Sequence, residues 1–301
     1  MPAEDSRGEE SPRFGGGGEQ SGAPTARRIV LGAQLRRLRE ACDISRAEAG
    51  YAIRGSDSKI SRMELGRVGF KERDVVDLLS MYGVNDEEER ALFIEMVRKS
   101  NERGWWHRYS GAMPNWFQDF VGLEESSSLI QSYELQFVPG LMQTEDYIRA
   151  VVSRGRPELL DQDGERRVAL RLRRQKVLTR QGAPRLWAVV DESVLHRPIG
   201  GPRVLREQIE HLLELTKQPN VTLQVLPYHM SGYAAEGAFS VLRFAEPTLP
   251  DIVYIEHLSG ALYLDRVEEL EVYGRVIDRL AVDAETPDRS RQMLAKYRQE
   301  I

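Results

Sequence analysis

The feature that most constrains the fold is a short helical pattern at residues 56–64, SDSKISRME. At 3.6 residues per turn, its apolar residues Ile60 and Met63 share one face, while the remaining faces carry small polar and cationic side chains. Ser56 is a typical N-cap, and Gly66 is typical of the residue that ends a helix. A helix of about two turns is marginal in water. Neighbouring helices must therefore hold it, and its outer face is free to meet a partner.

Three further helical patterns lie close to this one, at 27–40, 45–53 and 71–82. The pattern at 45–53 is separated from the one at 56–64 only by a turn that contains Gly55, which is the spacing of a helix-turn-helix. Four short helices with tight turns predict a small all-helical domain over residues 26–83.

The charge of the chain is divided unevenly. Residues 1–25 are rich in Gly, Ser and Glu and carry a net charge of −3, and we expect them to be a disordered acidic tail. Residues 26–83 hold twelve Lys or Arg against eight Asp or Glu, whereas residues 84–301 hold twenty-eight against thirty-four. A basic segment in an otherwise acidic chain is a place where a polyanion can dock.

The outer face of the helix at 56–64 fits the major groove of DNA. Small side chains let a helix approach closely there, and Arg62 could bind a guanine with both arms of its guanidinium. Lys59 is placed to neutralise a phosphate. Ser45 and Arg46 begin the preceding helix, whose N-terminal amides and dipole suit a phosphate.

The segment LGAQLRRLREACDISRAEAGYAIRGSDSKISRMELGR resembles the Xre family of lambda-repressor-like helix-turn-helix regulators over about fifty residues. Its strongest matches are LRRLRE, Ser45, the KIS at 59–61 and the E-x-G that begins at Glu64. By position, the resemblance implies that Asp57, Ser58 and Arg62 face the bases and that Arg46 contacts a phosphate. We therefore expect the DNA-binding residues to be Arg46, Asp57, Ser58, Lys59, Ser61 and Arg62.

The same resemblance implies a structural pair. Arg39 and Glu64 match positions that link the first helix to the third, so we expect them to support the fold rather than read DNA. Two residues depart from the family pattern: Gly50 stands where Ala is usual, at a cost near ~1 kcal/mol inside a helix, and Asp57 places an acid toward DNA.

Residues 84–301 predict an α+β domain. Short Val-, Leu- and aromatic-rich patterns joined mostly by turns predict a short-stranded, mostly antiparallel sheet flanked by helices. The expected strands are 185–190, 221–226, 237–244, 251–256 and 261–264. The expected helices are 85–100, 121–153 with an interruption at Pro139-Gly140, 164–181, 202–217, 266–282 and 287–300.

Several segments of this region, among them FVGLEESSSLIQSYE, VPGLMQTEDYIRAVV and QIEHLLELTKQPNVTLQVLP, resemble the C-terminal domain of WhiJ-like bacterial regulators. The similarity extends over almost all of residues 103–290. Such regulators join this domain to an Xre-type head, are often encoded beside a small acidic protein, and include some that are described as antitoxin-like. The resemblance implies a transcriptional regulator whose C-terminal domain receives a small acidic protein partner.

Two other functions stay open. A small-molecule ligand could bind an aromatic pocket lined by Trp105, Trp106, Trp116, Phe117 and Tyr147, although aromatic residues at such spacing are more often core. An enzyme with a DNA-tethering head is a more remote alternative, because the five histidines form no metal-binding motif and no nucleophile or phosphate-loop motif is present.

We therefore expect a cytoplasmic, DNA-binding regulator without catalytic residues, metal or cofactor, acting as a homodimer on operator DNA. Cys42 is the only cysteine, so the chain has no internal disulfide, and we expect this thiol to be buried. No stretch approaches the length of a membrane span, and the N-terminal residues lack the apolar core of a signal peptide.

Overall fold

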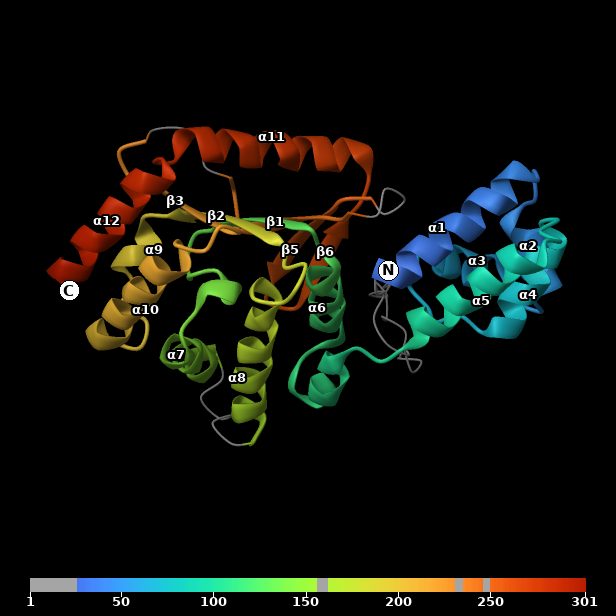
Figure 1. Cartoon of the computed structure of the whole chain (residues 1–301), viewed down its shortest axis with the longest axis horizontal. Coiled ribbons are helices and arrows are strands. Elements are labelled where there is room, and N and C mark those ends of the chain that lie inside the picture. Colours follow the sequence, from blue (N-terminus) through green and yellow to red (C-terminus); the bar gives the residue numbers. More distant parts are fainter. Residues whose placement is uncertain (1–25, 156–161, 231–234, 246–249) are drawn as a thin grey trace, which may run out of the picture.

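The computed structural model describes residues 26–155, 162–230, 235–245 and 250–301. The predicted acidic tail, 1–25, lies outside these ranges. Figure 1 shows a helical head at one end of the chain and a larger domain built around a sheet. The helices of the head are α1 (Ala26–Ala41), α2 (Arg46–Ala52), α3 (Asp57–Glu64), α4 (Glu72–Met81) and α5 (Glu87–Asn101).

The short helices of the head begin where side chains cap them. Ser45 and Glu48 form a reciprocal capping box at the start of α2, and the hydroxyl of Ser56 accepts a hydrogen bond from the amide of Lys59 at the start of α3. Gly66 follows α3 with φ +65°, a conformation that glycine adopts without strain. These local signals explain why the sequence predicts the helices of the head so closely.

One hydrophobic core holds the head together. Leu31 and Leu35 of α1 are buried against Ile60 and Met63 of α3, as the spacing of the apolar residues predicts. Helix α5, which the predicted boundary after residue 83 assigns to the second domain, adds the buried Phe93 to this core. By packing, α5 is part of the head.

The second domain contains a six-stranded mixed sheet in the order β3-β2-β1-β4-β5-β6. Its strands are β1 (Leu129–Glu134), β2 (Arg185–Asp191), β3 (Val221–Leu226), β4 (Phe239–Arg243), β5 (Ile252–His257) and β6 (Gly260–Leu264). The pairings from β1 through β4 and β5 to β6 are antiparallel, whereas β1, β2 and β3 pair in parallel. The α+β fold class is confirmed, with a parallel half that the sequence did not predict.

The central strand β1 corrects one expectation. Residues 121–153 were expected to be helical up to Pro139-Gly140, but the helix there ends at Ser126 and Leu129–Glu134 is a strand. This strand is buried on both faces, with Ile130 and Tyr133 in different hydrophobic clusters. A strand covered on both sides shows no polar–apolar alternation, so its period gives no signal.

Helices cover both faces of the sheet (Figure 1). One face is covered by α6 (Asn115–Ser126), α7 (Glu145–Gly155), α8 (Gln162–Gln175), α10 (Pro202–Leu215) and α12 (Pro287–Glu300). Helix α11 (Val267–Asp283) covers the other face. The short elements η1 (Trp105–Ala112), η2 (Gly140–Met142), η4 (Lys176–Leu178) and α9 (Ser193–His196) complete the domain.

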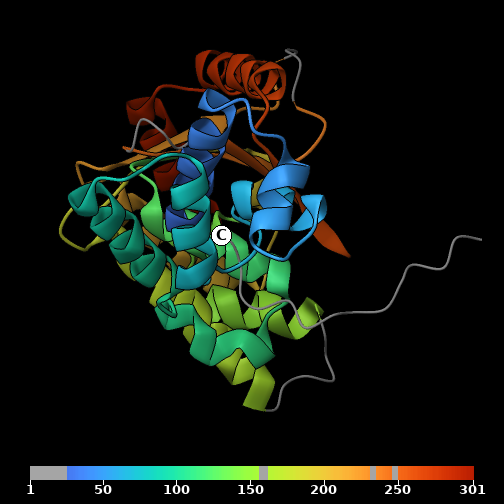
Figure 2. The same ribbon diagram turned by 90° about the vertical axis from the view of Figure 1, so that its right-hand side faces the viewer.

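The head contacts the second domain through α1. Ile29 and Val30 pack partly against the core of the second domain. Within the head, the guanidinium of Arg28 donates from Nε to the carbonyl of Ser100 on α5, 3.0 Å away. Figure 2, viewed from the side of the head, shows the blue and cyan helices in front of the second domain. Asp119 of α6 lies near Arg28, and burial raises the pKa of that carboxyl to about 8 although Arg28 opposes the shift.

Cys42 is exposed, which contradicts the expected burial; its thiol donates to the carbonyl of Tyr82 at 3.3 Å. Within the described residues, no helix is long and apolar enough to cross a membrane.

Candidate nucleic-acid interface

Helices α2 and α3 form one exposed surface, and the predicted DNA-binding residues lie on or next to it. Arg46, Asp57, Ser58 and Arg62 are exposed, while Lys59 and Ser61 are half-buried. The buried Ile60 of α3 anchors the opposite face of the helix in the core of the head. The short helix therefore presents its polar side outward on a rigid support.

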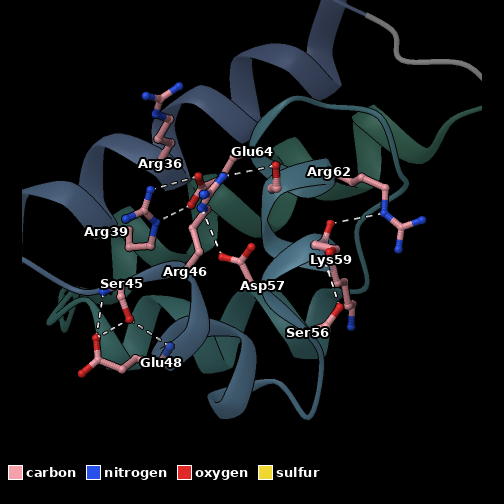
Figure 3. A network of polar contacts seen from close by, with 12 residues as sticks. Arg36, Arg39, Ser45, Arg46, Glu48, Ser56, Asp57, Lys59, Arg62 and Glu64 are labelled. Carbon is pink, nitrogen blue, oxygen red and sulfur yellow. Dashed lines mark hydrogen bonds and ion pairs between the residues drawn. The ribbon is translucent and has the colours of Figure 1, made fainter.

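Arg46 connects the two helices. Its Nε lies 3.2 Å from Oδ1 of Asp57, and its Nη1 lies 3.4 Å from the hydroxyl of Ser61 (Figure 3). About half of each charged side chain is exposed, so the ion pair contributes ~1 kcal/mol or less and can open at little cost. Asp57, the acid that seemed out of place opposite DNA, has its charge balanced by Arg46.

Arg62 lies at the exposed end of α3, and its Nε is 3.3 Å from the carbonyl of Ser58. Among the described residues, no carboxylate forms an ion pair with Arg62. Its guanidinium is thus available for an external acceptor, as Figure 3 shows by its outward direction.

Lys59 behaves differently from its neighbours. Its Nζ is 2.6 Å from Oδ2 of Asp74, a carboxylate on α4 that is almost fully buried. The ammonium thus joins α3 to α4 and does not stand free on the outer face. The sequence could not show this pair because the two residues lie on different helices.

Arg39 and Glu64, the expected structural pair, contact each other in the interior of the head. Nε and Nη2 of Arg39 lie 2.5 and 3.0 Å from the two carboxylate oxygens of Glu64, and Nη1 donates to the carbonyl of Ile44 at 2.7 Å. The hydrogen bonds that Arg39 donates to Glu64 raise the pKa of Arg39. This fork-to-fork geometry fixes α1 against α3.

A hollow of about 350 Å³ opens beside this pair. It is lined by Arg36, Arg39, Glu40, Arg46, Ser61, Glu64 and Leu65. Arg36 of α1 pairs with Glu40 at 2.8 Å and is drawn next to the buried pair in Figure 3. Arg36 is exposed on α1, and the contact of α1 with α3 brings it to the same hollow as Arg46.

The close approach of α2 to the start of α3 explains why residue 50 is a glycine. A Cβ at this position in α2 would lie 2.9 Å from the carbonyl carbon of Ser56. Glycine therefore lets α2 approach the start of α3 closely, which outweighs its poor helix propensity.

The five residues of the expected aromatic pocket lie in two hydrophobic clusters, which meet at Phe117. Trp106 is buried in a cluster with Met113, and Trp105 packs against the same cluster. Tyr147 is fully buried in a different cluster, where its hydroxyl accepts a hydrogen bond from the amide of Val138. Trp116 packs at the edge of that second cluster, and Phe117 packs against both clusters, with its ring centroid 6.0 Å from that of Trp116. These five aromatic side chains serve as core.

In the parts of the chain that the structure describes, no group of three or more His, Cys, Asp or Glu side chains is placed to hold a metal ion.

Comparison with known families agrees with the two-part architecture. Residues 30–93 match the family described as helix-turn-helix domain, a range that includes the first turns of α5. Residues 117–296 match the family described as domain of unknown function (DUF5753). No curated protein and no solved structure matches the chain. The helix-turn-helix match supports a DNA-binding regulator.

Proposed function

The chain belongs to the DUF5753 family, and because it also carries a helix-turn-helix head, we propose that it is a sequence-specific transcriptional regulator. In this proposal α3 enters the major groove and α2 directs its N-terminus to a phosphate. The chain has no catalytic role, and it acts in the cytoplasm, where operator DNA is accessible.

The observation that carries the proposal is the exposed α2–α3 surface. It combines Arg62, whose guanidinium has no carboxylate partner among the described residues and contacts only the carbonyl of Ser58, with a second cation, Arg46, whose ion pair to Asp57 is exposed and weak. Both stand on helices that a buried core and the Arg39–Glu64 pair hold rigidly. A rigid support is what base recognition requires, because a misplaced side chain loses its hydrogen bonds to the bases.

The roles of the two arginines differ. Arg62 reads a base, and we expect its contact with guanine to supply ~1–3 kcal/mol of discrimination. Arg46 contacts a phosphate together with the N-terminus of α2, so it contributes to binding of every sequence. Ser58 and Ser61 allow α3 to approach the groove closely, and Asp57 accepts from a cytosine amine when Arg46 turns to the phosphate.

The regulator acts as a homodimer on a two-fold operator. One head with an eight-residue recognition helix covers a small surface, and two heads on half-sites about one helical turn apart supply the missing affinity. The resemblance to WhiJ-like regulators supports a small acidic protein as the partner of the C-terminal domain, in an antitoxin-like arrangement.

The test is operator selection with the full chain from random duplex DNA, followed by binding titrations at several salt concentrations. Arg62→Ala is expected to bind the selected operator and altered sequences with similar affinity. Arg46→Ala is expected to weaken all duplexes alike and to reduce the salt slope by about 1. Arg275→Ala on the distant α11 removes the same charge from an exposed position and serves as the matched control.

Two outcomes would refute these assignments. If wild type shows no salt-dependent binding to any duplex, the DNA-binding proposal is wrong. If Arg62→Ala keeps full sequence preference, α3 does not read the operator through this side chain. Repeating the selection with a candidate acidic partner tests the partner separately, because an unchanged operator and affinity would argue against it.

A further inference from the structure

A group of charged and polar side chains lies between the sheet and α8 in the C-terminal domain. Side chains alternate along a strand, so Ser132 and Glu134 of β1 share the face of Ile130, which packs in the core beneath the helices. Tyr254 of β5 also packs in that core, and the exposed Glu256 follows it on the same face, where its carboxylate accepts a hydrogen bond from the hydroxyl of Tyr254 at 2.8 Å. Strand β4 separates the two strands.

Helix α8 places guanidinium groups opposite these side chains. Arg174 forms a buried bidentate pair with Glu124 of α6, with distances of 2.8 and 2.7 Å. One turn earlier, Arg171 makes only a 3.5 Å contact with the side-chain oxygen of Gln143. Within the described residues, no carboxylate lies within ion-pair distance of Arg171. We call Ser132, Glu134, Glu256, Arg167 and Arg171 the Glu134–Arg171 cluster.

Several members of the Glu134–Arg171 cluster have polar atoms without a partner. Ser132 is 5% exposed, and its hydroxyl makes no hydrogen bond within the described structure. Nε of Arg167 is buried and also unpartnered. Glu134 accepts no hydrogen bond from the described residues. A buried polar atom without a partner costs ~1–3 kcal/mol, so the fold alone gives no reason to keep these groups.

The charges of the cluster are perturbed for physical reasons that agree with this picture. The pKa of Glu134 is raised to about 8. Burial is the largest cause, the charge of Glu256 acts in the same direction, and the charge of Arg171 opposes the shift. Burial and the charge of Arg174 lower the pKa of Arg171 to about 10, although Glu256 and Glu134 act in the other direction. Glu134 and Arg171 are each half-buried, so part of their surface is accessible to solvent. They must therefore border a space that water can enter.

We propose that the Glu134–Arg171 cluster is a binding site for a small zwitterion, an amino acid or a short peptide. Its ammonium group lies between the carboxylates of Glu134 and Glu256, and its carboxylate binds the guanidinium of Arg171. Ser132 supplies a hydrogen bond to the same molecule. This site goes beyond the proposed DNA-binding function and does not depend on it.

The chemistry of the cluster disfavours other ligands. A simple anion would meet two carboxylates, and a simple cation would meet Arg171 and Arg167. A molecule with both charges meets a complementary group at each end, because the carboxylates come from the sheet and the guanidiniums from α8.

The first experiment measures thermal stability and calorimetric binding of the full chain with the twenty L-amino acids and a set of dipeptides. At least one of these is expected to raise Tm in a concentration-dependent way. The same compounds with an acetylated amine or an amidated carboxylate serve as controls, and both modifications are expected to abolish the shift. The proposal is wrong if no amino acid or dipeptide shifts Tm, or if the modified compounds act equally well.

The second experiment uses variants and the compound that binds most tightly. Glu134→Gln and Arg171→Gln are each expected to weaken its binding at least tenfold, while Lys176→Gln, an exposed change just beyond α8, leaves it unchanged. Glu134→Gln should fold at least as stably as wild type, because it removes a buried carboxylate that no neighbour satisfies. Binding retained by both variants, or a large loss of stability in Glu134→Gln, would overturn the assignment.

Discussion

The head and the C-terminal domain each contain one buried, bidentate arginine–glutamate pair. In the head, Arg39 of α1 binds Glu64 of α3. In the C-terminal domain, Arg174 of α8 binds Glu124 of α6. Both pairs join two helices of one domain by the same chemistry, so differences between their surroundings reflect what each domain is built to do.

The surroundings differ in how completely polar groups are satisfied. Around Arg39, the neighbouring charges pair with one another on the protein: Arg36 with Glu40 and Arg46 with Asp57. Near Arg174, the guanidinium of Arg171 and the carboxylate of Glu134 have no ion-pair partner among the described residues. The head thus places its function on an exposed surface above a satisfied scaffold. The C-terminal domain keeps unsatisfied groups inside, where only a molecule that enters could bind them.

The largest expected effects come from breaking one buried pair at a time. Glu64→Ala and Glu124→Ala each leave a buried guanidinium without its carboxylate, and each should cost about 3–5 kcal/mol in the free energy of unfolding. Glu64→Ala should lower the urea concentration at which the head is half unfolded. Glu124→Ala should lower the corresponding concentration for the C-terminal domain. Urea titrations followed by hydrogen exchange separate the two midpoints.

Glu72→Ala is the control for this comparison, because it removes an exposed ion pair with Arg98 and should leave the free energy of unfolding almost unchanged. If both core substitutions instead shift one common unfolding transition, the head and the C-terminal domain unfold as a single unit, and the prediction of two independent transitions is wrong.

The two regions should also respond oppositely to pH. In the head, the hydrogen bond from Arg36 lowers the pKa of Glu40, so that contribution to stability is lost only in acid. In the C-terminal domain, the folded state holds the proton of Glu134 more tightly than the unfolded chain does. Stability there should fall as the pH rises from roughly 4.3, the usual carboxyl pKa, to about 8, with a slope of up to one proton.

Unfolding titrations of wild type and Glu134→Gln between pH 5 and 9 measure this difference. The variant should lose less stability over that range, by a slope that approaches about 1.4 kcal/mol per pH unit at most. Asp119→Asn is a useful comparison, because burial also raises the pKa of that carboxyl to about 8. If the stability of wild type and of Glu134→Gln changes equally with pH, the pKa of Glu134 is the same in the folded and unfolded states, and the prediction is wrong.

Replacing a helical glycine with alanine should lower the free energy of unfolding in the head and raise it in the C-terminal domain. Gly50→Ala in α2 places a Cβ 2.9 Å from the backbone of Ser56, and the clash should cost about 1–3 kcal/mol, more than the gain in helix propensity. Gly274→Ala in α11 meets no atom within 4 Å and should stabilise the C-terminal domain by up to about 1 kcal/mol. Thermal unfolding of the two variants tests the signs, and stabilisation by Gly50→Ala would mean that α2 and α3 can move apart freely.

The head is the region that sequence reasoning predicted best, because its signals are local. Caps such as Ser45 and Ser56, the glycine after α3 and the apolar spacing of Ile60 and Met63 all act within one or two turns. The sequence did not predict the ion pair between Lys59 of α3 and Asp74 of α4. The two residues lie on different helices, and the periodicity within one helix does not show which carboxylate of another helix will lie near its cations.

In the C-terminal domain, sequence reasoning predicted the later strands and helices but missed the centre. β1 carries Gln131, Ser132 and Glu134 within six residues, so neither apolar content nor alternation marks it as a strand. The Glu134–Arg171 cluster depends on that strand, on β5 and on α8 together. The aromatic residues expected to line a pocket pack in or against two hydrophobic clusters.

The smallest expected effect compares two helix N-caps, Ser45 and Thr286. Both should contribute equally to stability, but only Ser45 should contribute to DNA binding. Ser45 accepts from the amide of Glu48 at 3.2 Å and begins α2, while Thr286 accepts from the amide of Arg289 at 3.3 Å and begins α12. Ser45→Ala and Thr286→Ala should each cost about 1 kcal/mol of stability. Only Ser45→Ala frays the turn that positions Arg46, so it alone should weaken binding to all duplexes, by a few-fold and without changing sequence preference. Equal DNA binding by the two variants would mean that the start of α2 does not contact the backbone, and that the phosphate contacts of the head come from other positions, such as the hollow beside Arg36.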